Sequence, residues 1–259
     1  MAAIVAPSAM GEPVFNISIE ETFPVLPKSP VAEAILEIKT ARSDALQDPA
    51  FLESVRQALP DYSDFKTEPS VVGPAQGALQ GVKGNTKDAG RIVHVFEDSF
   101  LFAWTQPYES WMQFKTEAMR LWQVYGNLTG ITPDQVNRIG LRYVNQIDIP
   151  LANNKAQLDD YLVNAPEPPK GLDLPMLAFL HQHLFHVPGH DYAVRVLSTI
   201  QEAPGLPSRR LTLDIEAITE KKSDLLKKKT LDKRLDDMRW LKNKAFFGSL
   251  KPKAWEATL

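Results

Sequence analysis

The sequence contains no cysteine among its 259 residues. This absence excludes disulfide bonds, zinc–thiolate sites, iron–sulfur clusters and a cysteine nucleophile. It also fits the reducing cytosol, so we expect a cytoplasmic protein. Residues 1–10 have no basic segment and do not have the pattern of a signal peptide. No run approaches the roughly 18–20 apolar residues that a membrane-spanning helix needs, so we expect no membrane partner.

What is present is the composition of an ordinary globular protein. Hydrophobic residues make up 44% of the chain, charged residues make up 24%, and the net charge is −3. These values give no argument for a nucleic-acid partner of the whole molecule. A proline-rich connector over residues 151–176 separates an N-terminal half (1–150) from a C-terminal half (177–259). The predicted fold is α+β, with antiparallel sheets from two loosely similar halves packed against two long helices.

Apolar periodicity predicts the elements of the N-terminal half. The predicted strands cover residues 31–39, 91–96, 99–105 and 138–149, and the predicted helices cover residues 48–59 and 108–125. We expect Asp48 to cap the first helix, and Gly126-Asn127 to end the second, whose aromatic stripe we expect to be core. Residues 15–19 alternate in polarity and predict a short edge strand. Residues 61–90 contain five glycines and predict a long loop or an irregular hairpin.

The C-terminal half has the pattern of an antiparallel meander followed by a helix. Three alternating runs cover residues 177–187, 192–201 and 209–218, with Pro188-Gly189 and Pro204-Gly205 at the turns. A long helix is predicted over residues 224–247. Its apolar stripe consists of Leu231, Leu235, Met238, Leu241 and Ala245.

The segment from Arg138 to Asn145, RIGLRYVN, is the most informative stretch of the chain. As a strand, it carries Ile139, Leu141 and Tyr143 on one face and Arg138, Gly140 and Arg142 on the other. Two interpretations of the arginines remain open. They form ion pairs with Asp214 and Glu216 if residues 209–218 lie in the same sheet, or they bind an anionic ligand or an acidic partner. Asn145 belongs to the apolar face, where a buried amide needs a hydrogen-bond partner.

Four of the five histidines lie close together, at positions 181, 183, 186 and 190. On a strand, His181 and His183 share a face at a spacing that could chelate a metal, but no carboxylate completes the ligand set. We therefore expect solvated or hydrogen-bonded histidines and no metal. No nucleophile accompanies them in the sequence, so we assign no catalytic residues.

Residues 221–253 form the clearest charge asymmetry. They hold twelve Lys or Arg and four Asp, a local charge of +8, which leaves −11 for the rest of a chain whose total is −3. The helix is either a solvated outer face or a surface for self-association or an acidic protein partner. Its predicted contacts are Lys228, Lys229, Lys233 and Arg239. Nucleic acid is the weaker candidate, because the aromatic residues of this helix have the spacing of a core.

Five short segments, spread over nearly the whole chain, carry a family resemblance. They are Pro30–Ile38 (PVAEAILEI), Tyr108–Trp111 (YESW), Arg138–Asn145 (RIGLRYVN), Leu213–Ile215 (LDI) and Asn243–Phe247 (NKAFF). Together they resemble a sporadically distributed family of uncharacterised bacterial proteins. Where relatives in that family have a histidine, this chain has Arg239, which weakens a catalytic role for the position. The patchy distribution of the family implies a regulatory or partner-binding role, antitoxin-like or linked to defence.

The sequence thus predicts a non-catalytic binding or regulatory protein that recognises a protein partner or a second copy of itself. The alternative is an enzyme or sensor that acts on an anionic small molecule or nucleotide. The residues predicted to bind such a ligand are Arg138, Arg142, Asn145, His181 and His183. We expect no cofactor, because no glycine-rich loop lies between a strand and a helix.

Overall fold

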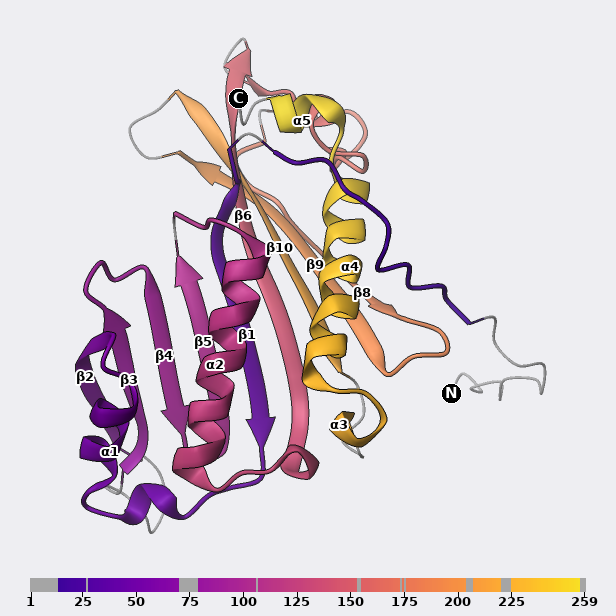
Figure 1. Ribbon diagram of the computed structural model, residues 1–259. Helices are drawn as coiled ribbons and strands as arrows, with labels where there is room; N and C mark the ends of the chain where they lie inside the picture. The colour runs from indigo at the N-terminus through magenta and orange to yellow at the C-terminus, as the bar shows by residue number, and fades with distance from the viewer. Residues whose placement is uncertain are drawn as a thin grey trace, which may run out of the picture.

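The computed structural model describes residues 14–26, 28–69, 79–105, 107–152, 155–172, 174, 176–203, 207–219 and 225–256. The described strands form one antiparallel sheet of 10 strands in the order β2-β3-β4-β5-β1-β6-β10-β9-β8, with β7 paired to β6 (Figure 1). The strands are β1 (Val31–Thr40), β2 (Tyr62–Pro69), β3 (Leu79–Thr86), β4 (Arg91–Phe96), β5 (Ser99–Thr105), β6 (Val136–Ala152), β7 (Lys155–Ala156), β8 (Leu180–His186), β9 (Tyr192–Glu202) and β10 (Ser208–Thr219).

Strands from both halves of the chain pair directly with each other. β6 lies between β1 and β10, and its pairing with β10 runs from Pro150 opposite Ser208 to Gly140 opposite Ile218. The α+β class is confirmed, but the two halves share one sheet instead of forming separate sheets. β6 explains the difference, because it pairs with β1 along residues 136–145 and with β10 along residues 140–150 and so joins the strands of both halves.

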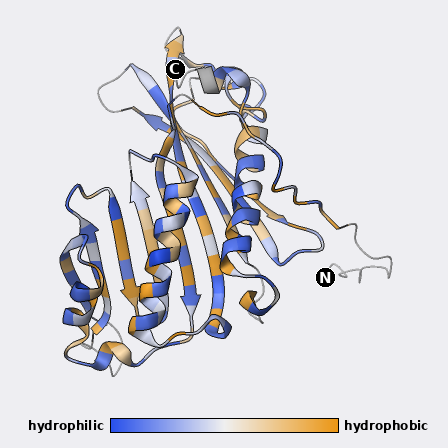
Figure 2. Cartoon of the chain, viewed as in Figure 1, coloured by the Kyte–Doolittle hydropathy of each residue, from blue (hydrophilic) through white to orange (hydrophobic). Residues whose placement is uncertain are grey.

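Two long helices cover one face of this sheet (Figure 1). The described helices are α1 (Phe51–Ala58), α2 (Trp111–Thr129), α3 (Leu225–Lys228), α4 (Leu231–Ser249) and α5 (Pro252–Glu256), with 3-10 turns at Ala45–Gln47, Pro133–Gln135 and Leu158–Asp160. Lys115 of α2 lies 2.8 Å from both Asp232 and Asp236 of α4, so the helices lie side by side. Both helices carry apolar and polar residues in alternation along their length (Figure 2), which fits one buried and one solvated side.

Helix caps correct two predicted boundaries. α2 continues through Gly126 to Thr129 and ends at Gly130, whose φ of 71° is left-handed and whose N–H donates to the Gly126 carbonyl. The helix predicted over residues 224–247 is two helices, because Thr230 is extended and its side chain accepts a hydrogen bond from the Lys233 N–H. The predicted turn at Pro204-Gly205 lies outside the described residues.

The start of the chain contradicts another expectation. Residues 15–19 do not form a strand, although the Phe15 N–H donates to the carbonyl of Pro188 at 2.8 Å. Residues 14–26 and 28–30, called the N-terminal strap below, instead run along the outer side of α4 (Figure 1). Phe23 stacks on Phe247 with ring centroids 5.5 Å apart, so aromatic packing takes the place of strand pairing.

The outer part of the N-terminal half is a hairpin. β2 pairs with β3 with register shifts, as the irregular-hairpin alternative predicts, and residues 70–78 lie outside the described part. α1 begins at Phe51 instead of residue 48, and its N-cap is Ala50, so the expected cap by Asp48 is wrong. The Asp48 side chain instead accepts a hydrogen bond from the Ala50 N–H at 2.8 Å, before the helix begins. Among the described helices, none combines the length and the apolar character that crossing a membrane requires.

Candidate protein-binding edge and ligand cavity

Arg138 and Arg142 lie on the face of the sheet opposite the helices, because Tyr143, which alternates with Arg142 along β6, packs against Phe114 of α2 with ring centroids 6.0 Å apart. Arg142 makes a two-pronged contact with Asp214, with Nε to Oδ1 and Nη2 to Oδ2 both at 2.8 Å. This hydrogen bonding raises the pKa of Arg142, and Asp214 is only 5% exposed. The pair is therefore a structural link between β6 and β10.

Arg138 joins three strands. Its guanidinium donates to Glu37 of β1 at 2.6 Å and to Glu216 of β10 at 2.7 Å. Gly140 makes room for this contact, because a Cβ there would lie 3.1 Å from the Glu216 carboxylate. The ion-pair interpretation of the two arginines is confirmed, whereas their predicted role in ligand binding stays a prediction.

Asn145 is not brought together with the arginines. It lies on the helix-covered face, is 4% exposed, and donates from its amide nitrogen to the Leu213 carbonyl at 3.0 Å. The expected partner for a buried amide is thus a backbone carbonyl of the neighbouring strand. His181 and His183 lie at a third place, on β8, at the outer edge of the sheet.

β8 is the most exposed strand of the sheet. All seven of its residues are exposed, and Leu180, Leu184 and Phe185 are 67%, 65% and 52% exposed. Its inner side pairs with β9, and no other described strand pairs with its outer side. Such an edge presents free backbone N–H and C=O groups to any strand that comes alongside.

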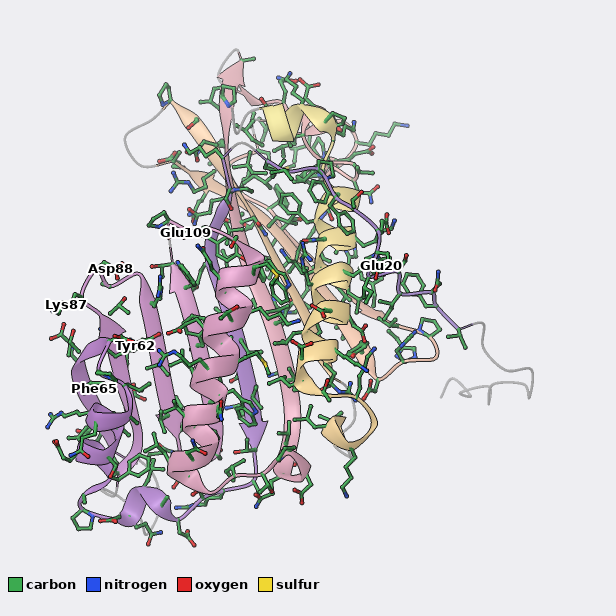
Figure 3. The ribbon with its side chains drawn as sticks, in the orientation of Figure 1. Glu20, Tyr62, Phe65, Lys87, Asp88 and Glu109 are labelled. Carbon is green, nitrogen blue, oxygen red and sulfur yellow. The ribbon has the colours of Figure 1, made fainter. Side chains whose placement is uncertain are left out.

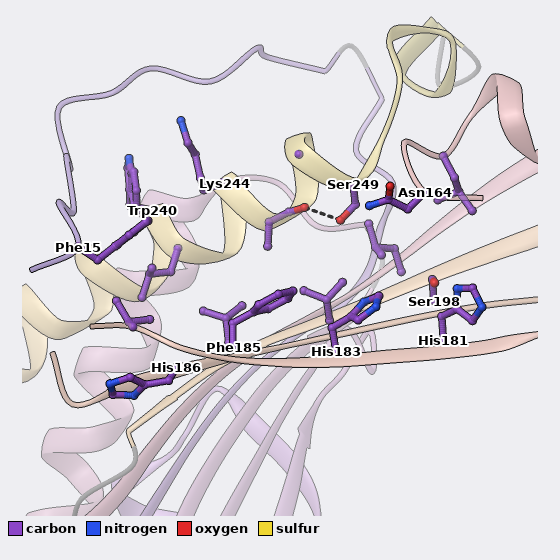
Figure 4. A pocket seen from close by; sticks show the side chains of 18 residues that line it. Phe15, Asn164, His181, His183, Phe185, His186, Ser198, Trp240, Lys244 and Ser249 are labelled. Carbon is purple, nitrogen blue, oxygen red and sulfur yellow. Dashed lines mark hydrogen bonds between the residues drawn. The ribbon is translucent and has the colours of Figure 1, made fainter. Parts of the chain in front are cut away.

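A mostly apolar cavity of about 630 Å³ lies between β8 and α4. His181, His183 and Phe185 extend from β8 toward the helix, and Trp240 and Lys244 line the other wall (Figure 4). The rings of His181 and His183 lie 6.4 Å apart, centroid to centroid. Within the described part of the chain, no group of three or more His, Asp or Glu side chains is arranged to hold a metal.

The predicted partner-binding residues of the basic helix are not equivalent. Lys229 pairs with the buried Asp237, while Lys233 and Arg239 are exposed on α4. The side chain of Lys228 lies outside the described residues. Arg234 is 2% exposed and pairs with Asp191 at 3.0 Å, so part of the positive charge belongs to the core.

A second cavity, of about 620 Å³, lies beneath the N-terminal strap. Its polar wall residues include Tyr108, Asn145, Arg239, Lys242 and Asn243. Most belong to, or lie beside, the short motifs that carry the family resemblance, although these motifs are far apart in the sequence. The sequence did not single out Lys242. The available signal was its position one turn from both Met238 and Phe246, which places a lysine on a buried stripe.

Lys242 lies in an environment that disfavours its charge. Its Nζ is 3.6 Å from the centroid of the Tyr143 ring, and no described carboxylate pairs with it. Burial, followed by the positive charge of Arg239, lowers the pKa of Lys242 to about 7. The Tyr143 hydroxyl hydrogen-bonds the Tyr108 hydroxyl at 2.9 Å, and burial raises the pKa of both phenols, that of Tyr108 to about 12.

No known family model matches the chain, and no curated protein matches it. Among solved structures, the chain is similar to TBP from Methanococcus jannaschii, with 14% sequence identity and a TM-score of 0.33. The matched region covers 82% of this chain and 99% of that chain. A similarity at this level defines neither a fold family nor a function for this protein.

Proposed function

We propose that this chain is a protein-binding protein whose recognition element is the exposed edge of β8, and that the strand that pairs there is β8 of a second copy. The observation that carries this proposal is the contrast between the two edges of the same sheet. One edge has the features that prevent strand pairing, and the other has none of them.

β2 is the protected edge. It contains Asp64, Lys66 and Glu68, and it ends at Pro69. Asp64 has a φ of 50°, and register shifts interrupt its pairing with β3. Charged residues, proline and irregular backbone are the usual means by which natural proteins keep an edge from pairing with other chains.

β8 is the unprotected edge. Residues 180–186 include no Lys, Arg, Asp, Glu or Pro, and their pairing with β9 continues without a shift from Leu180 to His186. A regular, uncharged edge with exposed leucine and phenylalanine loses little solvation when another strand covers it. It therefore favours strand addition, in which backbone hydrogen bonds provide affinity and side chains provide selectivity.

A second copy matches this edge in charge and polarity. Antiparallel pairing of β8 with itself around His183 would place Phe185 opposite His181 and Leu184 opposite Gln182 on both sides of the symmetry axis. No like charges would meet when histidine is neutral, and the apolar cavities of the two copies would lie near each other. Exposed residues of α4, such as Lys233, stay predicted contacts for a further acidic partner.

The test is the molar mass of the purified chain in solution, measured by light scattering over a range of concentrations. We expect a dimer, and we expect Leu184→Lys to weaken it by about tenfold or more, because charged side chains on an edge strand oppose pairing and the two lysines would lie diagonally across the strand pair. Leu184 is 65% exposed, so this substitution should leave the monomer folded.

Thr67→Lys is the matched control, since Thr67 is an exposed residue of the opposite edge strand. It introduces the same charge and should leave the molar mass unchanged. A wild-type chain that stays monomeric at high concentration would overturn the proposal. So would a Leu184→Lys chain that dimerises as strongly as the Thr67→Lys control.

A further inference from the structure

The cavity beneath the N-terminal strap has walls from four separate parts of the chain. The strap forms one wall, Tyr108 and Trp111 come from just before and at the start of α2, β6 contributes Asn145, and α4 contributes Arg239 and Lys242. Its volume of about 620 Å³ lies in the range of small-molecule sites, roughly 300–1,000 Å³. It is distinct from the edge of β8, which does not contribute to its walls.

Two cations line this cavity without a carboxylate partner among the described residues. Arg239 and Lys242 stand three positions apart on α4, and the contacts that the structure gives their charged groups are aromatic. Lys244 and Arg234 of the same helix are, by contrast, paired. Lys244 contacts Glu21 at 2.6 Å, and Arg234 contacts Asp191 at 3.0 Å.

Aromatic rings hold both cations in place. The Arg239 guanidinium carbon lies 5.7 Å from the Trp111 ring centroid, and Lys242 Nζ lies 3.6 Å from that of Tyr143. A ring face attracts a cation but does not neutralise it. Tyr108 and Tyr143 do not supply negative charge either, because burial raises the pKa of both hydroxyls and keeps them protonated.

The carboxylates around the cavity do not reach these cations. Glu21 accepts hydrogen bonds from Trp240 at 2.9 Å and from Lys244 at 2.6 Å, so it is already engaged. Glu20 lies on the strap outside α4, and Glu109 lies beside the start of α2 (Figure 3). Both are exposed, and neither forms an ion pair with Arg239 or Lys242.

We infer that this cavity binds a small organic anion, whose carboxylate or phosphate group lies between Arg239 and Lys242. The guanidinium provides a planar pair of donors for such a group, and the ammonium provides a compact charge beside it. The amide of Asn145 and the hydroxyl of Tyr108 are further polar groups on the walls. The anion supplies the counter-charge that the folded chain does not.

Binding would be linked to protonation of Lys242. The titratable groups that line the cavity with it are Tyr108 before α2, Arg239 on α4, and Glu20, Glu21 and Glu109 at its rim. Tyr143 on β6 contacts Lys242 through its ring. With its pKa lowered to about 7, Lys242 loses its charge as the pH rises through neutrality. The affinity for an anion is therefore expected to fall by up to tenfold per pH unit above neutrality.

The experiment is calorimetric titration of the full chain with sodium phosphate and, separately, with sodium succinate, at constant ionic strength and about pH 6.5. We expect one saturable site for at least one of the two probes, and the probe that binds more tightly identifies the anionic group. Lys242→Met and Arg239→Gln should each weaken binding by about tenfold or more. Lys233→Met is the matched control, because it removes an exposed charge of the same helix outside the cavity.

Two results would overturn the inference. One is the absence of saturable binding for both probes, and the other is equal binding by Arg239→Gln, Lys233→Met and the wild type. Arg239 is exposed, so its variant gives a valid answer even if Lys242→Met does not fold. Neither result depends on whether β8 forms a dimer, since the cavity and the edge share no residue.

Discussion

Arg142 and Tyr143 are adjacent on β6, and their side chains contact groups of opposite charge on opposite faces of the sheet. Arg142 donates two hydrogen bonds to the Asp214 carboxylate on the charged face. On the helix-covered face, the Lys242 Nζ lies 3.6 Å from the centroid of the Tyr143 ring. The alternation of side chains along β6 thus places a structural ion pair on one face and the contact with Lys242, which lines the cavity, on the other. Substitutions on the two faces should consequently have different effects.

Lys242 should make stability depend on pH. Its pKa of about 7 in the folded chain lies below its ordinary value of 10.5, so between these values the unfolded chain binds more protons. Stability from this group therefore rises with pH, by about 1.4 kcal/mol per pH unit at most. Urea unfolding of the wild type and Lys242→Met, at about pH 7 and 9, should show a smaller rise for the variant. Equal rises would show that Lys242 titrates normally.

Arg142 and Asp214 should stabilise the fold as a pair, so the effects of substituting them on the free energy of unfolding should not be additive. Arg142→Met should cost about 1–3 kcal/mol, because it leaves the buried Asp214 carboxylate with only a longer contact, of 3.4 Å, to Arg195. Asp214→Asn should cost less in the Arg142→Met background than alone. A double-mutant cycle from urea unfolding measures this coupling.

Arg209→Met is the control for this cycle, since Arg209 contacts Glu202, whose side chain is 85% exposed. It should change stability by less than about 0.5 kcal/mol. Additive effects of the Arg142 and Asp214 substitutions would contradict the structural role of the pair.

Two glycines should respond to alanine with opposite signs. At Gly140 a Cβ would lie 3.1 Å from the Glu216 carboxylate, so Gly140→Ala should lower the melting temperature by displacing the contact with Arg138. At Gly248, near the end of α4, a Cβ would meet nothing within 4 Å. Gly248→Ala should therefore be neutral or stabilise by about 0.5–1 kcal/mol through helix propensity. Thermal unfolding of both variants tests these two predictions. A lower melting temperature for Gly248→Ala together with an unchanged one for Gly140→Ala would contradict them.

Local patterns predicted the parts of the fold that depend on alternation and helical periodicity. The two faces of residues 138–145 followed from polarity alone, and the acidic residues 214 and 216 identified the strand that would satisfy the arginines. The helix ends were less predictable, because Gly126 and Gly130 both have the residue type of a cap. Which of them adopts the left-handed conformation depends on the turn that follows.

The candidate sites could not be predicted from local patterns, because they depend on how elements far apart in the sequence are placed in the fold. Alternation in residues 180–186 indicates a strand, but only the sheet order shows that nothing described covers its outer side. The ligand cavity combines the strap, α2, β6 and α4, which lie far apart in the sequence. Lys242 was counted with the basic face of its helix, although its spacing from Met238 and Phe246 placed it on the buried side.

The most direct test of the central claim is cross-linking of β8 to itself. The chain has no cysteine, so single cysteines introduced at each position from 181 to 185 report on contacts with a second copy alone. Opposed residues of antiparallel strands have Cα atoms about 4.5–5.5 Å apart, which suits a disulfide. A cysteine at Thr67 on the opposite edge is the control.

Pairing of β8 with a second copy predicts that mild oxidation gives a covalent dimer, with the highest yield at one position and lower yields on either side. The Thr67→Cys chain should remain monomeric on the same non-reducing gel. Dimer yields at all five positions no higher than at Thr67 would contradict the proposal that the exposed edge of β8 binds a second copy.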